Sequence, residues 1–447
     1  MPSVTFAQEL VTTIPSSATS NGTSKAPTGD EEQQEEELVA EVSSNDDKKS
    51  SLWRLVLIIF LFCGAIIVGI LLWSQDRIGG RSDSEGNGPP STTTPTDSPG
   101  EDNGLFENPA TVTWKTQALL PMRNANFSEI ALCGDGRTLV IANTSLLQIY
   151  RLLPSNETVP DWREVSNFPI PGNDVHALSL SGDGRRLAYA TASDNRVRFL
   201  EYLKASRWAL RPEYLGAKEH TFMSLDYSGE TLCLGQPTVT QTWRWSSGMS
   251  RWSMESATLP AAAGVRLSAD GQNLAIVDRR SLDILTYIRF FDGTWTIKGP
   301  VLSIEMPSTL DGNDSDDNMG PSAAISVDLS ADGNVLAVGS PGLVQVYYYI
   351  RGTWQIRQPP VPLSSNQSSN PLCVNDEGNI LATVDGELLR VFQATEDSWT
   401  PVGAPIDTVD GVSWDYLQCS SNGRGLVTGS RKAEVARILQ AVAEPPA

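Results

Sequence analysis

The stretch Leu329-Ser330-Ala331-Asp332-Gly333-Asn334-Val335-Leu336-Ala337-Val338-Gly339-Ser340-Pro341 decides the fold. Its Asp-Gly pair favours a tight reversal of the chain, because glycine adopts a positive φ angle at little steric cost. An alternating run, Ile325–Ser330, precedes the turn, and a second run of small and β-branched residues follows it. Such alternation is typical of strands that face a crowded interior on one side. The stretch therefore predicts a β-hairpin.

The same pattern occurs seven times in the last three quarters of the chain. Each repeat has a turn glycine and a leucine three residues later. The glycines are Gly136, Gly184, Gly229, Gly271, Gly333, Gly378 and Gly423, and the leucines are Leu139, Leu187, Leu232, Leu274, Leu336, Leu381 and Leu426. A third strand such as Val344–Tyr349 and a fourth strand that opens at a tryptophan complete each repeat. Four strands at a period in the forties are the signature of a propeller blade.

The tryptophans predict how the ring of blades closes. Those that follow the first six glycines are Trp162, Trp208, Trp252, Trp295, Trp354 and Trp399. The seventh repeat ends at Arg437–Leu439 without one, whereas Thr111–Thr116, which contains Trp114, matches the fourth-strand pattern. We therefore expect an all-β, seven-bladed propeller over residues 109–440, followed by a C-terminal tail, 441–447. Its last blade combines an N-terminal strand with three C-terminal strands, which leaves no exposed sheet edge.

The quoted stretch, continued by Gly352-Thr353-Trp354, resembles the seven-bladed propellers of the WD-repeat-like class. It is more closely similar to the FG-GAP-like repeats of single-pass surface proteins of marine microbes and algae. The chain departs from both patterns, since no third strand ends in Trp-Asp and the calcium loops of integrin-type FG-GAP blades are not recognisable. The resemblance implies the fold and leaves the ligand open.

An uninterrupted apolar segment, Leu55–Trp73, predicts one transmembrane helix within residues 51–75. It is long enough to cross a bilayer core, contains no charge and no proline, and is flanked by Trp53 and Trp73, where indoles prefer the membrane interface. Residues 1–50 are acidic and nearly free of aromatic residues, so we expect a disordered cytoplasmic tail. Residues 76–108 are rich in Ser, Thr, Pro and Gly and are expected to be a stalk.

Two features favour a type II orientation, with the N-terminus in the cytoplasm and the propeller extracellular or luminal. Slightly more basic residues lie on the N-terminal side of the helix than on its C-terminal side. The region beyond the helix also carries five N-glycosylation sequons, all in expected loops. Their asparagines are Asn126, Asn143, Asn156, Asn313 and Asn366.

Charge and cysteine content limit the possible partners. The chain has 53 Asp and Glu against 33 Lys and Arg, a net charge of -20, and no basic stripe, which excludes a nucleic-acid role. Cys133, Cys233, Cys373 and Cys419 fall in separate blades without metal-ligand spacing, and buried free thiols are the expectation. A Cys133–Cys419 disulfide stays open, because the blades of these two residues become neighbours when the ring closes.

The two histidines supply a weak candidate site. His176 and His220 stand near the start of first strands, beside Asp174 and Glu219. Such positions lie near the mouth of a propeller channel, where the four residues could form a shared ligand site. A local hydrogen-bonded role is the alternative. No nucleophile elbow, phosphate loop or paired metal motif accompanies them.

An inserted acidic loop supplies a weak calcium candidate, and no other cofactor is expected. Its oxygen ligands would come from Asp311, Asp314, Asp316 and Asp317. The spacing does not match the EF-hand pattern, and an exposed acidic loop explains the composition equally well.

Three function classes remain open from the sequence. The one adopted is a membrane-anchored, non-catalytic surface or luminal binding module, whose loops contact a protein or a glycan. The second is a luminal propeller enzyme, a lactonase-like hydrolase with a metal at the central channel. The third is a membrane-tethered cytosolic scaffold, which the sequons and the stalk disfavour.

Overall fold

The computed structural model describes residues 106–107, 109–121, 127–143, 145–154, 160–170, 175–191, 193–203, 207–216, 222–304, 325–364, 370–407 and 414–443. They all belong to one compact unit, Ser98–Ala447. The expected cytoplasmic tail, the membrane segment 51–75 and residues 76–105 of the expected stalk lie outside the described residues. Among the residues that the structure describes, no helix is long and apolar enough to cross a bilayer.

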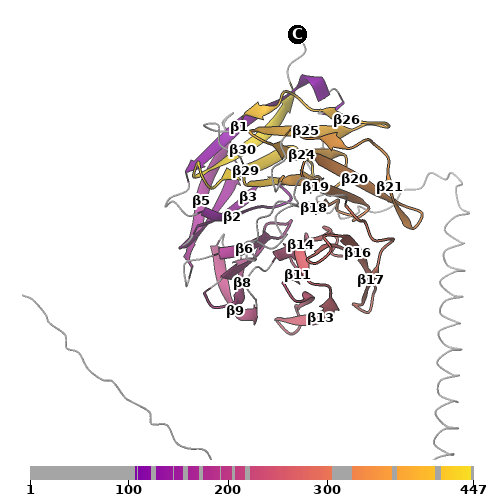
Figure 1. The fold of residues 1–447 in the computed structure, drawn as a ribbon. Coiled ribbons are helices and arrows are strands. Elements are labelled where there is room, and N and C mark those ends of the chain that lie inside the picture. The colour runs from indigo at the N-terminus through magenta and orange to yellow at the C-terminus, as the bar shows by residue number, and fades with distance from the viewer. Residues whose placement is uncertain are drawn as a thin grey trace, which may run out of the picture. The chain divides into compact units, whose positions relative to one another are not determined.

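Seven antiparallel sheets form the blades of a ring, which confirms the predicted seven-bladed propeller (Figure 1). The first strand of each blade contacts the first strands of both neighbouring blades, so these strands line a central channel. In chain order the first strands are β2 (Phe127–Leu132), β6 (Val175–Leu180), β10 (Phe222–Leu225), β14 (Ala262–Leu267), β18 (Ser326–Leu329), β23 (Leu372–Val374) and β28 (Tyr416–Cys419).

The next two strands of each blade carry most of its hydrophobic core. The second strands are β3 (Thr138–Asn143), β7 (Arg186–Thr191), β11 (Thr231–Gly235), β15 (Asn273–Asp278), β19 (Val335–Ser340), β24 (Ile380–Asp385) and β29 (Gly425–Ser430). The third strands are β4 (Leu146–Leu153), β8 (Arg196–Leu203), β12 (Thr240–Ser246), β16 (Ile284–Arg289), β20 (Leu343–Ile350), β25 (Leu388–Ala394) and β30 (Val435–Ala443).

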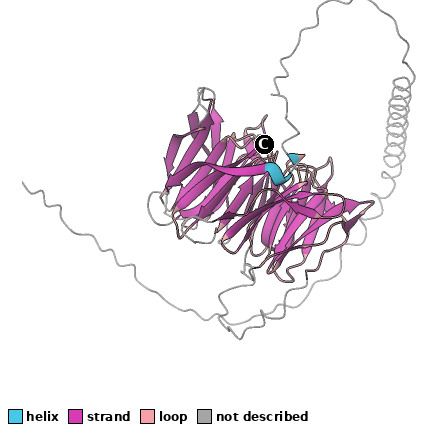
Figure 2. Ribbon diagram, turned by 90° about the horizontal axis from the view of Figure 1, so that it is seen from above, coloured by secondary structure: helices cyan, strands magenta, loops and turns pink. Residues whose placement is uncertain are grey.

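The fourth strands form the outer rim. They are β5 (Asp161–Pro169), β9 (Arg207–Gly216), β13 (Arg251–Leu259), β17 (Trp295–Ile297), β21 (Thr353–Ile356), β26 (Trp399–Pro401) and β1 (Val112–Pro121). Two short strands, β22 (Val361–Pro362) and β27 (Ile406–Asp407), pair with β20 and β25. A short helical turn, η3 (Pro109–Thr111), precedes β1 and appears in cyan near the C-terminal end in Figure 2.

The predicted closure by a mixed blade is confirmed. β1 pairs antiparallel with β30, from Val112 opposite Ala443 to Pro121 opposite Val435. Because β1 holds the end of β30 in this register, the last strand runs to Ala443. The expected boundary at residue 440 is therefore three residues short.

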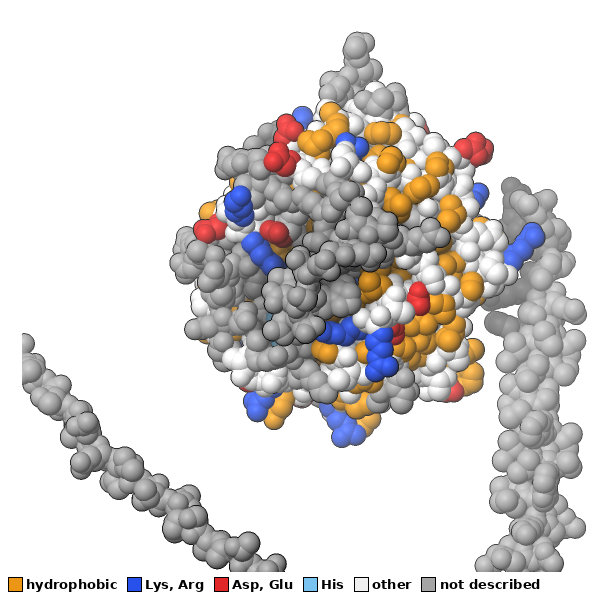
Figure 3. Space-filling view, in the orientation of Figure 1, with side chains coloured by type: hydrophobic (Ala, Val, Ile, Leu, Met, Phe, Trp, Pro, Cys, Tyr) orange, Lys and Arg blue, Asp and Glu red, His pale blue; other side chains and the backbone are white. Residues whose placement is uncertain are grey.

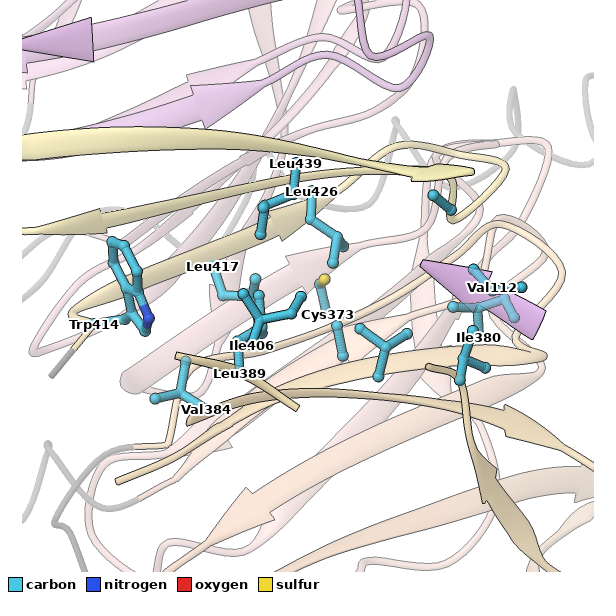
Figure 4. Packing of buried hydrophobic residues seen from close by; sticks show 14 residues of the cluster. Val112, Cys373, Ile380, Val384, Leu389, Ile406, Trp414, Leu417, Leu426 and Leu439 are labelled. Atoms are coloured by element: carbon cyan, nitrogen blue, oxygen red, sulfur yellow. The ribbon is translucent and has the colours of Figure 1, made fainter. Parts of the chain in front are cut away.

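The turn glycines and the leucines of the repeats have the conformation and the burial that their pattern predicts. All seven turn glycines have φ between +64° and +72°, and all seven leucines are fully buried. The leucines pack in clusters between neighbouring blades, as Figure 4 shows for Leu426 at the junction between the blade of β23–β27 and the blade of β28–β30 and β1. Four of the six rim tryptophans are buried as well, namely Trp208, Trp252, Trp354 and Trp399. Burial of large aromatic and aliphatic side chains between blades stabilises the ring.

Candidate functional site

One end of the channel is bounded by the turns between first and second strands. In each blade we take the residue two positions before the turn glycine, and we call these residues together the turn ring. Its members are Gly134, Gly182, Tyr227, Ala269, Ala331, Asp376 and Ser421. Backbone hydrogen bonds of 2.6 to 3.2 Å join neighbouring turns at every blade junction, and the bond from Ser421 N to Gly134 O joins the last blade to the first. The turn ring is therefore a closed belt that fixes the mouth of the channel.

Local turn chemistry holds the belt in place. In the turn at Ser330, the serine Oγ donates to Asp332 Oδ1 at 2.7 Å and accepts from Val335 N at 2.9 Å. Asp332 Oδ1 also accepts from Asn334 N at 2.9 Å. Because serine and aspartate side chains satisfy the turn amides, the turn keeps one shape.

The blade of β10–β13 departs from this pattern, because Tyr227 occupies the position where the other blades have Gly, Ala, Ser or Asp. Its ring lies over Gly182 of the neighbouring blade and reaches Gly134 of the blade beyond it. A Cβ atom on Gly182 would overlap the ring, and one on Gly134 would lie 3.2 Å from Tyr227 Cε2. Tyr227 is nevertheless 43 % exposed. Tyr227 therefore presents an aromatic surface across part of the channel mouth.

Below the turn ring lies a cavity of about 180 Å³ whose lining is contributed by first strands of all seven blades. In four blades, the side chain two positions before the turn links its blade to the next by accepting a backbone N–H group. The acceptors are Ser179 Oγ for Leu225 N, Ser224 Oγ for Leu267 N, Asp328 Oδ2 for Val374 N and Gln418 Oε1 for Leu132 N, at 2.6 to 2.9 Å. These hydrogen bonds satisfy the buried polar groups of the channel wall.

Arg266 and Asp328 form an ion pair inside the channel. Arg266 Nε donates to Asp328 Oδ1 at 2.5 Å, and Asp328 is nearly fully buried. The Arg266 side chain is 41 % exposed, but only toward the channel, because Arg266 lines the cavity between the first strands. The Asp328 carboxylate, the main influence, raises the pKa of the Arg266 guanidinium, so this pair carries no net charge.

Asp226 and Asp376 place two carboxyl groups in the cavity lining, and Asp376 is the one that belongs to the turn ring. Burial raises the pKa of this carboxyl above its ordinary value. The hydrogen bond with Ser421 and the Arg266 charge lower that pKa, and the Asp328 charge raises it. Because Arg266 is already paired with Asp328, the local balance at the mouth is negative.

The acidic residues around Tyr227 also make the channel mouth negative. Burial raises the pKa of its hydroxyl, and the charges of Asp135, Asp183 and Asp376 raise it further. An exposed aromatic ring beside carboxylates attracts cations, through the negative face of the ring and through direct charge pairing.

A second polar and aromatic cluster lies between the blades of β6–β9 and β10–β13. The guanidinium groups of Arg186 and Arg211 lie 5.6 and 6.0 Å from the ring centre of Trp245. Both arginines also pair with Glu201. Since the enclosed space is only about 20 Å³ and both arginines share the one carboxylate of Glu201, we interpret the cluster as packing between two blades.

Figure 3 shows how side chains are distributed on one face of the ring. Described hydrophobic side chains gather over β16, β17 and β20, whereas Lys and Arg side chains stand near β9 and β13. The exposed arginines of these two rim strands are Arg207 and Arg251.

The residues proposed from the sequence are only partly within the described part of the chain. His176 is the second residue of β6, at the end away from the Asp183 turn, and it does not line the cavity. Its expected companions, Asp174, Glu219 and His220, lie outside the described residues, as do the calcium candidates Asp311, Asp314, Asp316 and Asp317. Within the described ranges, no group of three or more His, Cys, Asp or Glu side chains could hold a metal ion.

The asparagine of one sequon, Asn143, falls in the described residues, and it is not in a loop. Asn143 is the last residue of β3 and is 1 % exposed. Its Oδ1 accepts from Ser145 N at 3.0 Å and from Leu146 N at 2.7 Å, because an asparagine at a strand end can satisfy the following turn. Asn126, Asn156, Asn313 and Asn366 lie outside the described residues.

The described cysteines are all free thiols. Cys133 lies among residues of the β6–β9 blade, and its Sγ donates to Asp135 Oδ1 at 2.7 Å. Cys419 belongs to a different cluster, between the blade of β23–β27 and the blade that β1 completes. The Cys133–Cys419 pair considered from the sequence is therefore not formed.

No protein-family model matches the chain, and the curated proteins contain no match to it. The WD-repeat-like or FG-GAP-like class is therefore an expectation from the sequence, while the propeller fold rests on the structure.

Proposed function

We propose that this protein is a non-catalytic binding module, and that the mouth of its channel at the turn ring binds a Lys or Arg side chain of a partner protein. The observation that carries the proposal is the combination of the exposed Tyr227 side chain with the half-buried Asp376 carboxyl at the edge of a polar cavity. Burial disfavours the charged form of Asp376, and a cation at the mouth would restore it.

The shape of the turn ring supports an opening beside these two residues. The blades of β14–β17 and β18–β22 contribute only the methyl groups of Ala269 and Ala331 to the ring. Tyr227 and Asp376 belong to the blades on either side of them. A long basic side chain that passes the methyl groups would meet the aromatic ring on one side and the carboxylate on the other.

Selection from a peptide display library on the full chain in detergent micelles tests the chemistry of the partner. We expect enriched peptides to share one Lys or Arg, and we expect replacement of that residue by norleucine or citrulline to abolish binding. Selection on the Tyr227→Ala and Asp376→Asn variants should not enrich these peptides. Enrichment of peptides without a common basic residue would contradict the proposal.

We also propose that the propeller is displayed outside the cell or in a lumen, above one membrane-spanning segment. The apolar segment Leu55–Trp73, the stalk composition and the sequons support this arrangement. Display favours a receptor or adhesion role over the alternative of a tethered cytosolic scaffold. A lactonase-like hydrolase is the second alternative, and no described group of side chains favours it.

Expression of the full chain in a eukaryotic cell tests the topology. We expect removal of N-glycans to shift its gel mobility and the propeller to resist protease in intact microsomes. The Asn143→Gln variant should keep the wild-type mobility shift, because Asn143 is buried in the folded blade. An unshifted chain with a digested propeller would place the propeller in the cytosol.

A further inference from the structure

Two cysteines face each other across one blade junction. Cys373 is in β23 and Cys419 is in β28, the first strands of neighbouring blades. Cys373 is 2 % exposed and belongs to the core cluster between these blades, and Cys419 packs against the same cluster. Figure 4 shows the sulfur of Cys373 turned toward Leu426 of the neighbouring blade.

The register of the repeats explains why the thiols meet. Side chains two positions before a turn point toward the following blade, and side chains one position before a turn point toward the preceding blade. At the adjacent junction, the Asp328 side chain reaches the backbone of Val374 at 2.9 Å from the same pair of positions. Cys373 and Cys419 occupy the equivalent positions one junction further on.

The other junctions carry no such pair at these positions. In chain order, their residues are Ala131 with Leu180, Ser179 with Leu225, Ser224 with Leu267, Arg266 with Leu329, Asp328 with Val374, and Gln418 with Leu132. Burial, the largest cause, and the neighbouring Cys419 thiol both raise the pKa of the Cys373 thiol.

We propose that Cys373 and Cys419 are a disulfide-forming pair that cross-links the blade of β23–β27 to the blade completed by β1. Cys419 also lines the channel cavity, so a small oxidant reaches it there. Its thiolate attacks the oxidant first, and the Cys373 thiolate then displaces the reduced oxidant from the Cys419 sulfur. The two thiols lose two electrons and two protons, which the oxidant accepts, and one S–S bond forms.

The cross-link would reinforce the place where the ring closes. The last blade depends on β1, which is more than 300 residues away from its partner strand β30 in sequence. A bond between Cys373 and Cys419 holds this blade to its neighbour independently of β1, and it limits the freedom of the unfolded chain.

Oxidation of the full chain in detergent micelles tests the pair. The reduced Cys63→Ser variant is treated with diamide, which accepts two electrons and two protons, and then unfolded, alkylated with N-ethylmaleimide and digested with trypsin. Cleavage after Arg357, Arg390 and Arg424 separates the two cysteines into peptides 358–390 and 391–424. We expect these peptides to be joined, whereas Cys133 and Cys233 carry the alkyl group.

Matched variants make the result specific. Cys133→Ser should leave the cross-link unchanged, and Cys419→Ser should abolish it. Alkylation of both Cys373 and Cys419 after oxidation, or a cross-link that includes Cys133, would overturn the proposal. The outcome does not depend on the binding partner or on the side of the membrane, because the oxidant is added to purified protein.

Discussion

Deletion of β1, Val112–Pro121, from the full chain is expected to abolish cooperative unfolding of the propeller. Without β1, the whole length of β30 becomes an exposed edge that pairs with other chains. The deletion also removes Val112 and Leu120 from two different junction clusters and the bond from Trp114 Nε1 to Val402 O. The combined loss is on the order of 5 kcal/mol or more, which is comparable to the stability of a typical domain.

Scanning calorimetry of the full chain in detergent micelles measures this effect. The matched control is deletion of residues 84–93, which removes the same number of residues from the expected stalk. The control should keep the wild-type transition, and the β1 deletion should aggregate or unfold without a transition. A shared midpoint for the two deletions would mean that the ring closes without β1.

Substitution of Gly333 by alanine is expected to have the next largest effect on the free energy of unfolding. Gly333 has φ of +64°, and a Cβ atom there would overlap Asn273 Cβ and lie 2.5 Å from Asn273 Cγ. Asn273 has little room to withdraw, because its Nδ2 donates to Asp332 O at 2.9 Å and its Oδ1 accepts from Lys298 Nζ at 2.8 Å. Strain and overpacking together cost about 4 kcal/mol.

The Gly352→Ala variant separates backbone strain from crowding. Gly352 also has a positive φ, +87°, but no atom lies within 4 Å of the added Cβ position. We expect this variant to lose about 1 to 2 kcal/mol, from backbone strain alone. Urea denaturation followed by tryptophan fluorescence measures both variants. Equal losses at the two glycines would show that the Asn273 contact does not restrict the turn.

Local sequence patterns were sufficient to predict the blades and their closure. Asp332-Gly333 and its equivalents mark turns in which the glycine takes a positive φ angle. This pair can be found by comparing the repeats of the chain with one another. Leu336 and its equivalents repeat at a fixed distance from that turn. The position of Trp114 predicted that β1 completes the last blade, because a fourth strand was missing only at the C-terminal end.

The candidate site could not be predicted from these local patterns, because it depends on which residues face each other across blade junctions. Arg266 and Asp328 are 62 residues apart, and Cys419 packs against the cluster of Cys373 rather than that of Cys133. The positions that face each other across a junction could nevertheless be found in the sequence. Aligned on their turns, two consecutive repeats carry opposite charges two positions before the turn, and a single repeat carries a tyrosine, Tyr227, where the others have smaller residues.

The affinity of a selected Lys- or Arg-containing peptide for the Asp376→Asn variant tests the binding proposal most directly. The control is Tyr214→Ala on β9, which removes an aromatic ring that is 54 % exposed at the rim and contacts Arg196. Titration calorimetry should show a loss of about tenfold to a hundredfold for Asp376→Asn, because a charge-assisted hydrogen bond contributes roughly 1.5–3 kcal/mol, and no change for the control. Unchanged affinity for Asp376→Asn, or an equal loss for both variants, would contradict a cation site at the channel mouth.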